Sequence, residues 1–287
     1  MTMLQIFVLA AVQGAAELLP VSSSAHVIVA AKLMGLNPTT PEMTLLLVML
    51  HTGTMFAVII YFWKSWRENF FPSRRDFWRT VKLLLLATVL TGVVGLALKA
   101  LIERLAFGTA DKAEIEMLFG NLGLVSGALA AVGVLIIYAG LLGKAIATSK
   151  PLGVRQAAVI GAVQGLCLPL RGFSRSGATI SAGLLLGIAK ERVESFSFAL
   201  AVVLTPPVIA REAVRLLKAQ AGTGTMEGGH LVGLFVPGMC GMVMSCLSGL
   251  FALKWLSGWL EEGRWHYFGY YCLVFSFYVL LLHTYGV

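Results

Sequence analysis

Long apolar runs separated by short polar segments dominate the pattern of this chain. Six of these runs have the roughly 20 residues that a helix needs to cross the hydrocarbon core of a bilayer. They cover residues 43–63, 81–102, 117–142, 195–217, 230–253 and 265–285. The pattern therefore predicts an all-α polytopic membrane protein with six transmembrane helices.

Two further apolar segments are interrupted in a way that a simple transmembrane helix is not. Residues 4–35 are broken around Pro20, and residues 154–188 are broken around Pro169. Each segment predicts two short helices joined by polar, non-helical backbone. Such backbone survives at membrane depth only where protein shields it or where it lines a wet cavity. We therefore expect two re-entrant helical hairpins.

The two expected hairpins resemble each other in sequence. The tetrapeptide Ala-Val-Gln-Gly ends at Gly14 and again at Gly165, and a proline, a serine-rich turn and an apolar helix follow each copy. Inverted repeats with broken helices that meet near the midplane are typical of transporters. We expect a single membrane domain over residues 1–287, with halves of approximately 1–142 and 154–287 related as an inverted repeat.

The charged residues, only 13% of the chain, indicate its orientation. Connection 64–82 carries six basic and two acidic residues, 144–155 carries three basic and no acidic ones, and 103–116 carries two basic and four acidic ones. Basic loops stay in the cytoplasm, which places both termini outside and opens the first hairpin from the outer side. Orientation thus accounts for the net charge of +8, and we expect no nucleic-acid partner.

Ionisable side chains inside apolar segments are costly, so Glu17, His26 and Arg175 are the first candidates for function. The serines of the two turns also have a structural explanation, because serine is a preferred N-cap of helices. His51, inside the run 43–63, either lines the same cavity or is a buried histidine with satisfied hydrogen bonds. The sequence leaves both alternatives open.

Together these groups have the chemistry of a phosphate site. Helix N-termini and Gly/Ser-rich turns offer free N–H groups to an anion, and the forked donors of arginine match phosphate oxygens. A serine hydroxyl beside a histidine is typical of nucleophilic or acid–base catalysis. If the tips of both hairpins meet, the carboxylate, serine and histidine of the first hairpin face Arg175 across one pocket.

At these residues the chain resembles the bacterial undecaprenyl-diphosphate phosphatase family of the bacitracin-resistance type. The first family motif, E-G-x-T-E-F-L-P-V-S-S-[ST]-G-H, stands here as Q-G-A-A-E-L-L-P-V-S-S-S-A-H, from Gln13 to His26. The second, P-G-x-S-R-S-G-x-T, stands here as R-G-F-S-R-S-G-A-T, from Arg171 to Thr179. Size and motif spacing also fit, so the resemblance covers essentially the whole chain.

The resemblance implies an integral enzyme of the bacterial inner membrane that recycles the carrier lipid of the cell envelope. Such an enzyme converts a polyprenyl diphosphate to the monophosphate and inorganic phosphate, in an active site that opens to the outer side. Its functional residues carry over to Glu17, Ser23, His26 and Arg175 as catalytic residues, with Ser22, Ser174 and Ser176 nearby. The residues that we expect to bind substrate in this chain are Gln13, Ser22, Ser24, Arg171, Ser174, Ser176, Gly177 and Thr179. The family is also described as needing a divalent cation, Mg²⁺ or Ca²⁺, for which Glu17 is the candidate ligand.

In this hypothesis Ser23 attacks the terminal phosphorus with His26 as its acid–base partner, and Glu17 orients His26 or binds the cation. Ser22 or an activated water is an alternative nucleophile. Arg175 and the N–H groups of the turns stabilise charge on the transferring phosphoryl group. The sequence does not decide between a monomer and a homodimer.

Three departures from the family motifs change the expected site. Gln13 replaces the first glutamate, Ala25 the glycine before the histidine, and Arg171 the proline of the second motif. A site with one acid fewer and one base more binds a cation less well and an anion more readily, so we expect this protein to need a higher concentration of metal, or no metal. A paralogue with another lipid phosphate substrate would look the same. The alternative function is a transporter or flippase that moves a lipid phosphate or another anion without hydrolysis.

Overall fold

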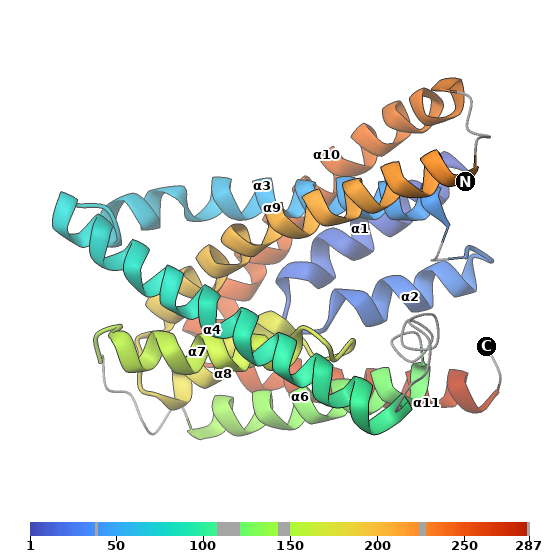
Figure 1. Ribbon diagram of the computed structural model, residues 1–287. Coiled ribbons are helices and arrows are strands. Elements are labelled where there is room, and N and C mark those ends of the chain that lie inside the picture. The colour runs from blue at the N-terminus through green and yellow to red at the C-terminus, as the bar shows by residue number, and fades with distance from the viewer. Residues whose placement is uncertain (38–39, 108–120, 143–149, 224–227, 286–287) are drawn as a thin grey trace.

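The computed structural model describes residues 1–37, 40–107, 121–142, 150–223 and 228–285, and the elements within these ranges are helices (Figure 1). Six of the helices are long and apolar enough to cross a membrane. These are α3 (Pro41–Asn69), α4 (Arg74–Phe107), α6 (Leu122–Leu142), α9 (Lys190–Thr223), α10 (Gly228–Glu261) and α11 (Trp265–Thr284). The prediction of an all-α membrane protein with six spans is confirmed.

Most of these helices extend beyond the apolar runs that predicted them. α4 begins at Arg74, before the run 81–102, because helical hydrogen bonding continues through polar residues that favour a helix end, such as Asp76 in its first turn. α3 begins where Thr40 Oγ1 accepts the N–H of Met43 at 3.3 Å. The predicted loop residues 108–116 and 144–149, and residues 117–120 of one predicted run, lie outside the described residues.

Two pairs of short helices occupy the interrupted segments. They are α1 (Met3–Leu18) with α2 (Ser23–Leu33), and α7 (Val154–Cys167) with α8 (Arg175–Leu185). In each pair a hydrogen bond joins the two arms at the end away from the turn. Gln5 Nε2 donates to the Met34 carbonyl at 3.4 Å, and the Lys150 N–H donates to the Gly187 carbonyl at 3.0 Å. Two short helices joined by non-helical backbone are therefore confirmed in both segments.

Glycines allow each hairpin to pack closely against a long helix. A Cβ on Gly14 of α1 would collide with the carbonyl of Ser245 in α10, and a Cβ on Gly165 of α7 would lie 2.8 Å from the carbonyl of Thr91 in α4. Real Cβ atoms do not approach a carbonyl oxygen this closely, so both positions require glycine, which has no side chain. The position of each hairpin is thus fixed by backbone contact with α10 or α4.

The two hairpins open toward opposite ends of the bundle (Figure 1). Ile6, near the start of α1, belongs to one hydrophobic cluster with Leu46, near the start of α3. The carbonyl of Leu152, just before α7, accepts a hydrogen bond at 3.3 Å from Arg79, near the connection between α3 and α4. The tips of the hairpins therefore meet between the long helices, where the candidate functional residues lie.

Candidate functional site

The carboxylate of Glu17, in the last turn of α1, is the centre of the site. Its Oε1 accepts from Arg175 Nη2 at 2.9 Å, and its Oε2 accepts from Ser23 Oγ at 2.6 Å and from Gln13 Nε2 at 3.1 Å. Gln13 lies one turn earlier on α1, while Ser23 begins α2 and Arg175 begins α8. The structure therefore brings together four of the predicted residues, from both motifs.

Arg175 compensates the charge of Glu17 at this depth. A carboxylate that leaves water is strongly disfavoured unless a cation and further hydrogen bonds replace its hydration. The side chain of Glu17 is only 17% exposed and that of Arg175 only 21%. This 2.9 Å ion pair joins the tips of the two hairpins, so it holds the hairpins together and also positions two candidate functional residues.

His51 of α3 also faces Glu17. Its Nε2 lies 3.6 Å from Glu17 Oε2, and its Nδ1 lies 2.7 Å from the carbonyl of Leu47 one turn earlier. The His51 side chain is 40% exposed, so its ring is partly accessible from outside the protein. His51 is therefore not a buried histidine and lies beside the candidate residue Glu17.

The helices α2 and α8 both begin at this site, but only one has a side-chain cap. Ser174 Oγ accepts the N–H of Gly177 at 3.2 Å, as expected for an N-cap of α8. Ser22 precedes α2 with a φ of 68° and makes no capping hydrogen bond. Its Oγ lies 3.2 Å from that of Ser24, which accepts the N–H of Gly172 from the opposite hairpin at 3.3 Å. A positive φ is costly for a serine, and such backbone strain is concentrated at functional sites.

His26 is engaged away from Glu17, which corrects the predicted pairing of these two residues. Its Nδ1 lies 2.8 Å from the carbonyl of Ser22, and its Nε2 lies 2.7 Å from the hydroxyl of Tyr271 in α11. Its ring stacks on Phe275, with 3.9 Å between the centroids. Among the described residues Glu17 therefore holds Ser23 directly, and His26 is oriented by α11.

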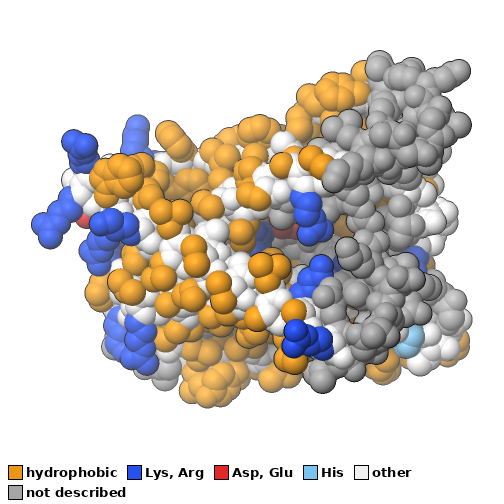
Figure 2. Space-filling model, in the orientation of Figure 1, with side chains coloured by type: hydrophobic (Ala, Val, Ile, Leu, Met, Phe, Trp, Pro, Cys, Tyr) orange, Lys and Arg blue, Asp and Glu red, His pale blue; other side chains and the backbone are white. Residues whose placement is uncertain are grey.

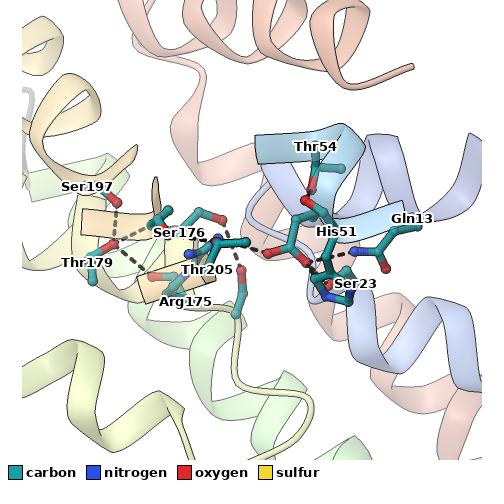
Figure 3. Close-up of polar contacts among 12 residues, drawn as sticks. Gln13, Ser23, His51, Thr54, Arg175, Ser176, Thr179, Ser197 and Thr205 are labelled. Atoms are coloured by element: carbon teal, nitrogen blue, oxygen red, sulfur yellow. Dashed lines mark hydrogen bonds and ion pairs between the residues drawn. The ribbon is translucent and has the colours of Figure 1, made fainter. Parts of the chain in front are cut away.

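Other predicted substrate-binding residues have structural roles. Thr179 is fully buried, and its Oγ1 lies 2.6 Å from Ser197 Oγ of α9, so it fixes α8 to α9 (Figure 3). The contact of Thr179 with substrate stays a prediction. The Ser176 hydroxyl donates to the carbonyl of Leu19 at 3.2 Å and so joins the hairpin tips. Arg171 is exposed on the connection between α7 and α8.

Tyr271 and Phe275, the residues of α11 that hold the His26 ring, were not predicted from the sequence. Both belong to a predicted transmembrane run that is rich in aromatic residues, where aromatic side chains are expected near the membrane interface. Tyr271 is separated from His26 by 245 positions. No sequence signal distinguishes these two rings from their aromatic neighbours.

The residues of this site do not fit a divalent cation. Within the described part of the chain, no group of three or more His, Cys, Asp and Glu side chains could hold a metal ion. The oxygens of Glu17 already accept from a guanidinium, an amide and a hydroxyl. Mg²⁺ and Ca²⁺ require several oxygen ligands, most often including carboxylates. The charge of Glu17 is therefore balanced by Arg175 in this arrangement.

Comparisons with known proteins agree with the motifs. Residues 6–278 match the family profile described as "Bacitracin resistance protein BacA". The chain is 57% identical to "Undecaprenyl-diphosphatase 2" of Acinetobacter baylyi, over 98% of both chains. It is 30% identical to the "Undecaprenyl-diphosphatase" proteins of Halothermothrix orenii and Rhodopirellula baltica, again over 98% of each chain. The chain therefore belongs to the bacitracin resistance protein BacA family.

Proposed function

We propose that this protein is an undecaprenyl-diphosphatase of the bacterial inner membrane. It hydrolyses undecaprenyl diphosphate to the monophosphate and inorganic phosphate, and so returns the carrier lipid to use in the cell envelope. The observation that carries this proposal is the 2.6 Å contact between Ser23 Oγ and Glu17 Oε2, at the N-termini of α2 and α8. The name of the relative at 57% identity supports this substrate.

In the proposed reaction Glu17 acts as the general base. The proton of the Ser23 hydroxyl moves to Glu17 Oε2 as Oγ forms a bond to the terminal phosphorus. The bond from that phosphorus to the bridging oxygen breaks, and the lipid monophosphate leaves. Water then attacks the phosphoserine, one proton of this water passes to Ser23 Oγ as the bond from Oγ to phosphorus breaks, and inorganic phosphate departs with the other. Ser22 is less suited to attack because its Oγ pairs with Ser24.

Phosphate binding is supported by groups that converge on Ser23. The guanidinium of Arg175 donates to Glu17 through Nη2. Its other N–H groups form a planar fork of donors that matches the oxygens of a phosphoryl group. The first N–H groups of α2 and α8 add the positive end of two helix dipoles. Catalysis of phosphoryl transfer depends mainly on such positioning and charge stabilisation.

We also propose that the hairpins are re-entrant and that the halves form an inverted repeat within one membrane domain. The matched contacts of Gly14 with Ser245 and of Gly165 with Thr91 support this relation. Basic side chains gather at the end of the molecule where α3 meets α4 (Figure 2). By the positive-inside rule that end is cytoplasmic, and the first hairpin then opens to the outer side. Both hairpins belong to one chain, so the pocket needs no second copy, and a homodimer stays a prediction.

A second candidate function is transport of a lipid phosphate without hydrolysis. The specific observation in its favour is that the two hairpins open toward opposite ends of the bundle, as expected for alternating access. A nucleophile held on a base at 2.6 Å has no purpose in a transporter, so hydrolysis is the better supported function.

The test is the release of inorganic phosphate from undecaprenyl diphosphate by purified protein in detergent. We expect Ser23→Ala and Glu17→Gln to lose activity by about a hundredfold or more. Ser73→Ala, at the exposed connection between α3 and α4, is the matched control and should stay active. No phosphate release by the wild-type protein, together with lipid movement in vesicles, would favour the transporter.

A further inference from the structure

His51 lies outside both motifs, but it approaches the same carboxylate oxygen of Glu17 as the reacting Ser23 does. Its Nε2 is 3.6 Å from Glu17 Oε2, the atom that accepts the Ser23 hydroxyl at 2.6 Å. Its Nδ1 must donate to Leu47, because a carbonyl oxygen can only accept. The tautomer is thereby fixed, and Nε2 is the nitrogen that can exchange a proton at Glu17.

The position of His51 relative to Glu17 is held by α10. The Ser245 hydroxyl donates at 3.0 Å to the carbonyl of Leu50, the residue before His51. The backbone carbonyl of the same Ser245 contacts Gly14, less than one turn before Glu17. One segment of α10 therefore fixes the positions of α1 and α3 relative to each other along the bundle. A pair of residues that exchanges a proton needs such rigid support.

The proposed reaction requires a path for a proton. Hydrolysis of a diphosphate trianion to two phosphate dianions releases one proton, and Glu17 must lose the proton that it took from Ser23 before the next cycle. Glu17 is only 17% exposed, whereas His51 is 40% exposed. The charged groups that face His51 are Glu17 from α1 and, behind it, Arg175 from α8. His51 is thus the more exposed group of the pair that it forms with Glu17.

The other histidine of the site cannot take this part in the same geometry. Both ring nitrogens of His26 are engaged in hydrogen bonds, with Ser22 and Tyr271, and its ring is stacked on Phe275. Among the described residues, His51 is the histidine that approaches Glu17.

We propose that His51 is the proton-relay residue of this enzyme, which takes from Glu17 the proton that Ser23 released and passes it to water. This inference rests on the proposed phosphatase function. His51 acts through Glu17 and makes no bond to phosphorus. The exchange is balanced, because Glu17 returns to a carboxylate as His51 becomes an imidazolium, and His51 returns to the neutral ring when water takes the proton.

The experiment compares the wild type with His51→Gln, His51→Ala and the control His283→Gln, which removes a histidine near the end of α11. Phosphate release from undecaprenyl diphosphate is measured across pH, with and without added imidazole. We expect both His51 variants to lose about a hundredfold in kcat with little change in KM. Protonated His51 cannot accept a proton, so the wild-type rate should fall toward acid pH, and this acidic limb should change shape in His51→Gln.

Imidazole separates a relay from a structural role. The ring of His51 is partly exposed, so its removal in His51→Ala leaves a space that imidazole can enter from solvent. We expect imidazole to restore at least about tenfold of the lost rate in His51→Ala and to leave wild type and His283→Gln unchanged. Lost activity without rescue, with the wild-type pH profile kept in His51→Gln, would overturn the relay, as would wild-type activity in His51→Gln. If the wild-type protein releases no phosphate, the proposed function fails and the inference with it.

Discussion

The hydroxyl of Tyr271 donates a hydrogen bond to His26 Nε2 at 2.7 Å and joins α11 to the first turn of α2. The direction of this bond follows from the other ring nitrogen, since Nδ1 faces the carbonyl of Ser22 and must carry its hydrogen. The ring of Phe275 stacks on the ring of His26, with 3.9 Å between their centroids. α11 therefore holds His26 in one tautomer, although α11 belongs to neither motif.

Removing the Tyr271 hydroxyl tests this tie. Tyr271→Phe keeps the aromatic ring but leaves His26 Nε2 without its donor, and we expect a loss of about 1 kcal/mol in stability and a lower rate of phosphate release. Thermal unfolding in detergent and the phosphate assay measure the two effects. Tyr278→Phe, on the same helix and without a hydrogen bond to His26, is the control; equal behaviour of both variants would refute the role of the tie.

Arg175→Lys should lose most activity. Lysine keeps the positive charge but cannot hold Glu17 and a phosphoryl group with two planar arms. Removing one oriented donor of this kind costs about a hundredfold or more in kcat. The measurement is phosphate release at equal protein concentration, with Arg192→Lys on the exposed first turn of α9 as the control. Activity near that of the control would remove Arg175 from the phosphate site.

Gln13→Glu should make the enzyme respond to metal. Gln13 Nε2 donates to Glu17 at 3.1 Å, and a glutamate in its place puts two carboxylates side by side. Their repulsion is relieved by a proton or by a divalent cation. We expect the wild type to work in the presence of a chelator, and Gln13→Glu to be stimulated by Mg²⁺ or Ca²⁺. The readout is a metal titration of phosphate release for both proteins.

The control for this titration is Gln156→Glu, which changes the same residue type in the first turn of α7, at the end of that helix away from the site. A glutamate is favoured there by the positive end of the helix dipole. Identical titration curves for wild type, Gln156→Glu and Gln13→Glu would show that position 13 does not govern the cation.

Gly14→Ala should separate α1 from α10. The new methyl group would collide with the carbonyl of Ser245, which cannot move without disturbing α10. Overpacking of this kind costs about 1–3 kcal/mol, and the displaced Glu17 should lower activity. Gly92→Ala in α4 is the matched control, because a Cβ there meets no atom within 4 Å. We expect the control to be neutral or slightly more stable; two variants of equal stability and activity would contradict the packing argument.

Both termini are expected outside the cytoplasm. The basic connection between α3 and α4 determines this orientation. A reporter that is active only in the cytoplasm should be silent when fused after Val287 and active when fused after Ser73. A strong cytoplasmic signal from the fusion at Val287 would reject the orientation and the outward opening of the first hairpin.

The sequence alone determined the spans, the two broken segments and the core chemistry of the site. A bilayer requires about 20 apolar residues per helix, so the length of each run identified a span before any packing was known. Proline and polar residues around Pro20 and Pro169 marked backbone that cannot continue as a helix. The cost of ionisable groups at such depth singled out Glu17 and Arg175, whose contact the structure records at 2.9 Å.

Only the tertiary structure decided which partner each polar side chain meets. Periodicity assigns a side chain to a face of its helix, but it does not say which helix covers that face. His26 therefore turned to Tyr271, Thr179 to Ser197, and His51 of α3 to Glu17. The meeting of His51 with Glu17 depends on how closely Gly14 of α1 and Gly53 of α3 let both helices approach α10, and that approach is a property of the assembled bundle.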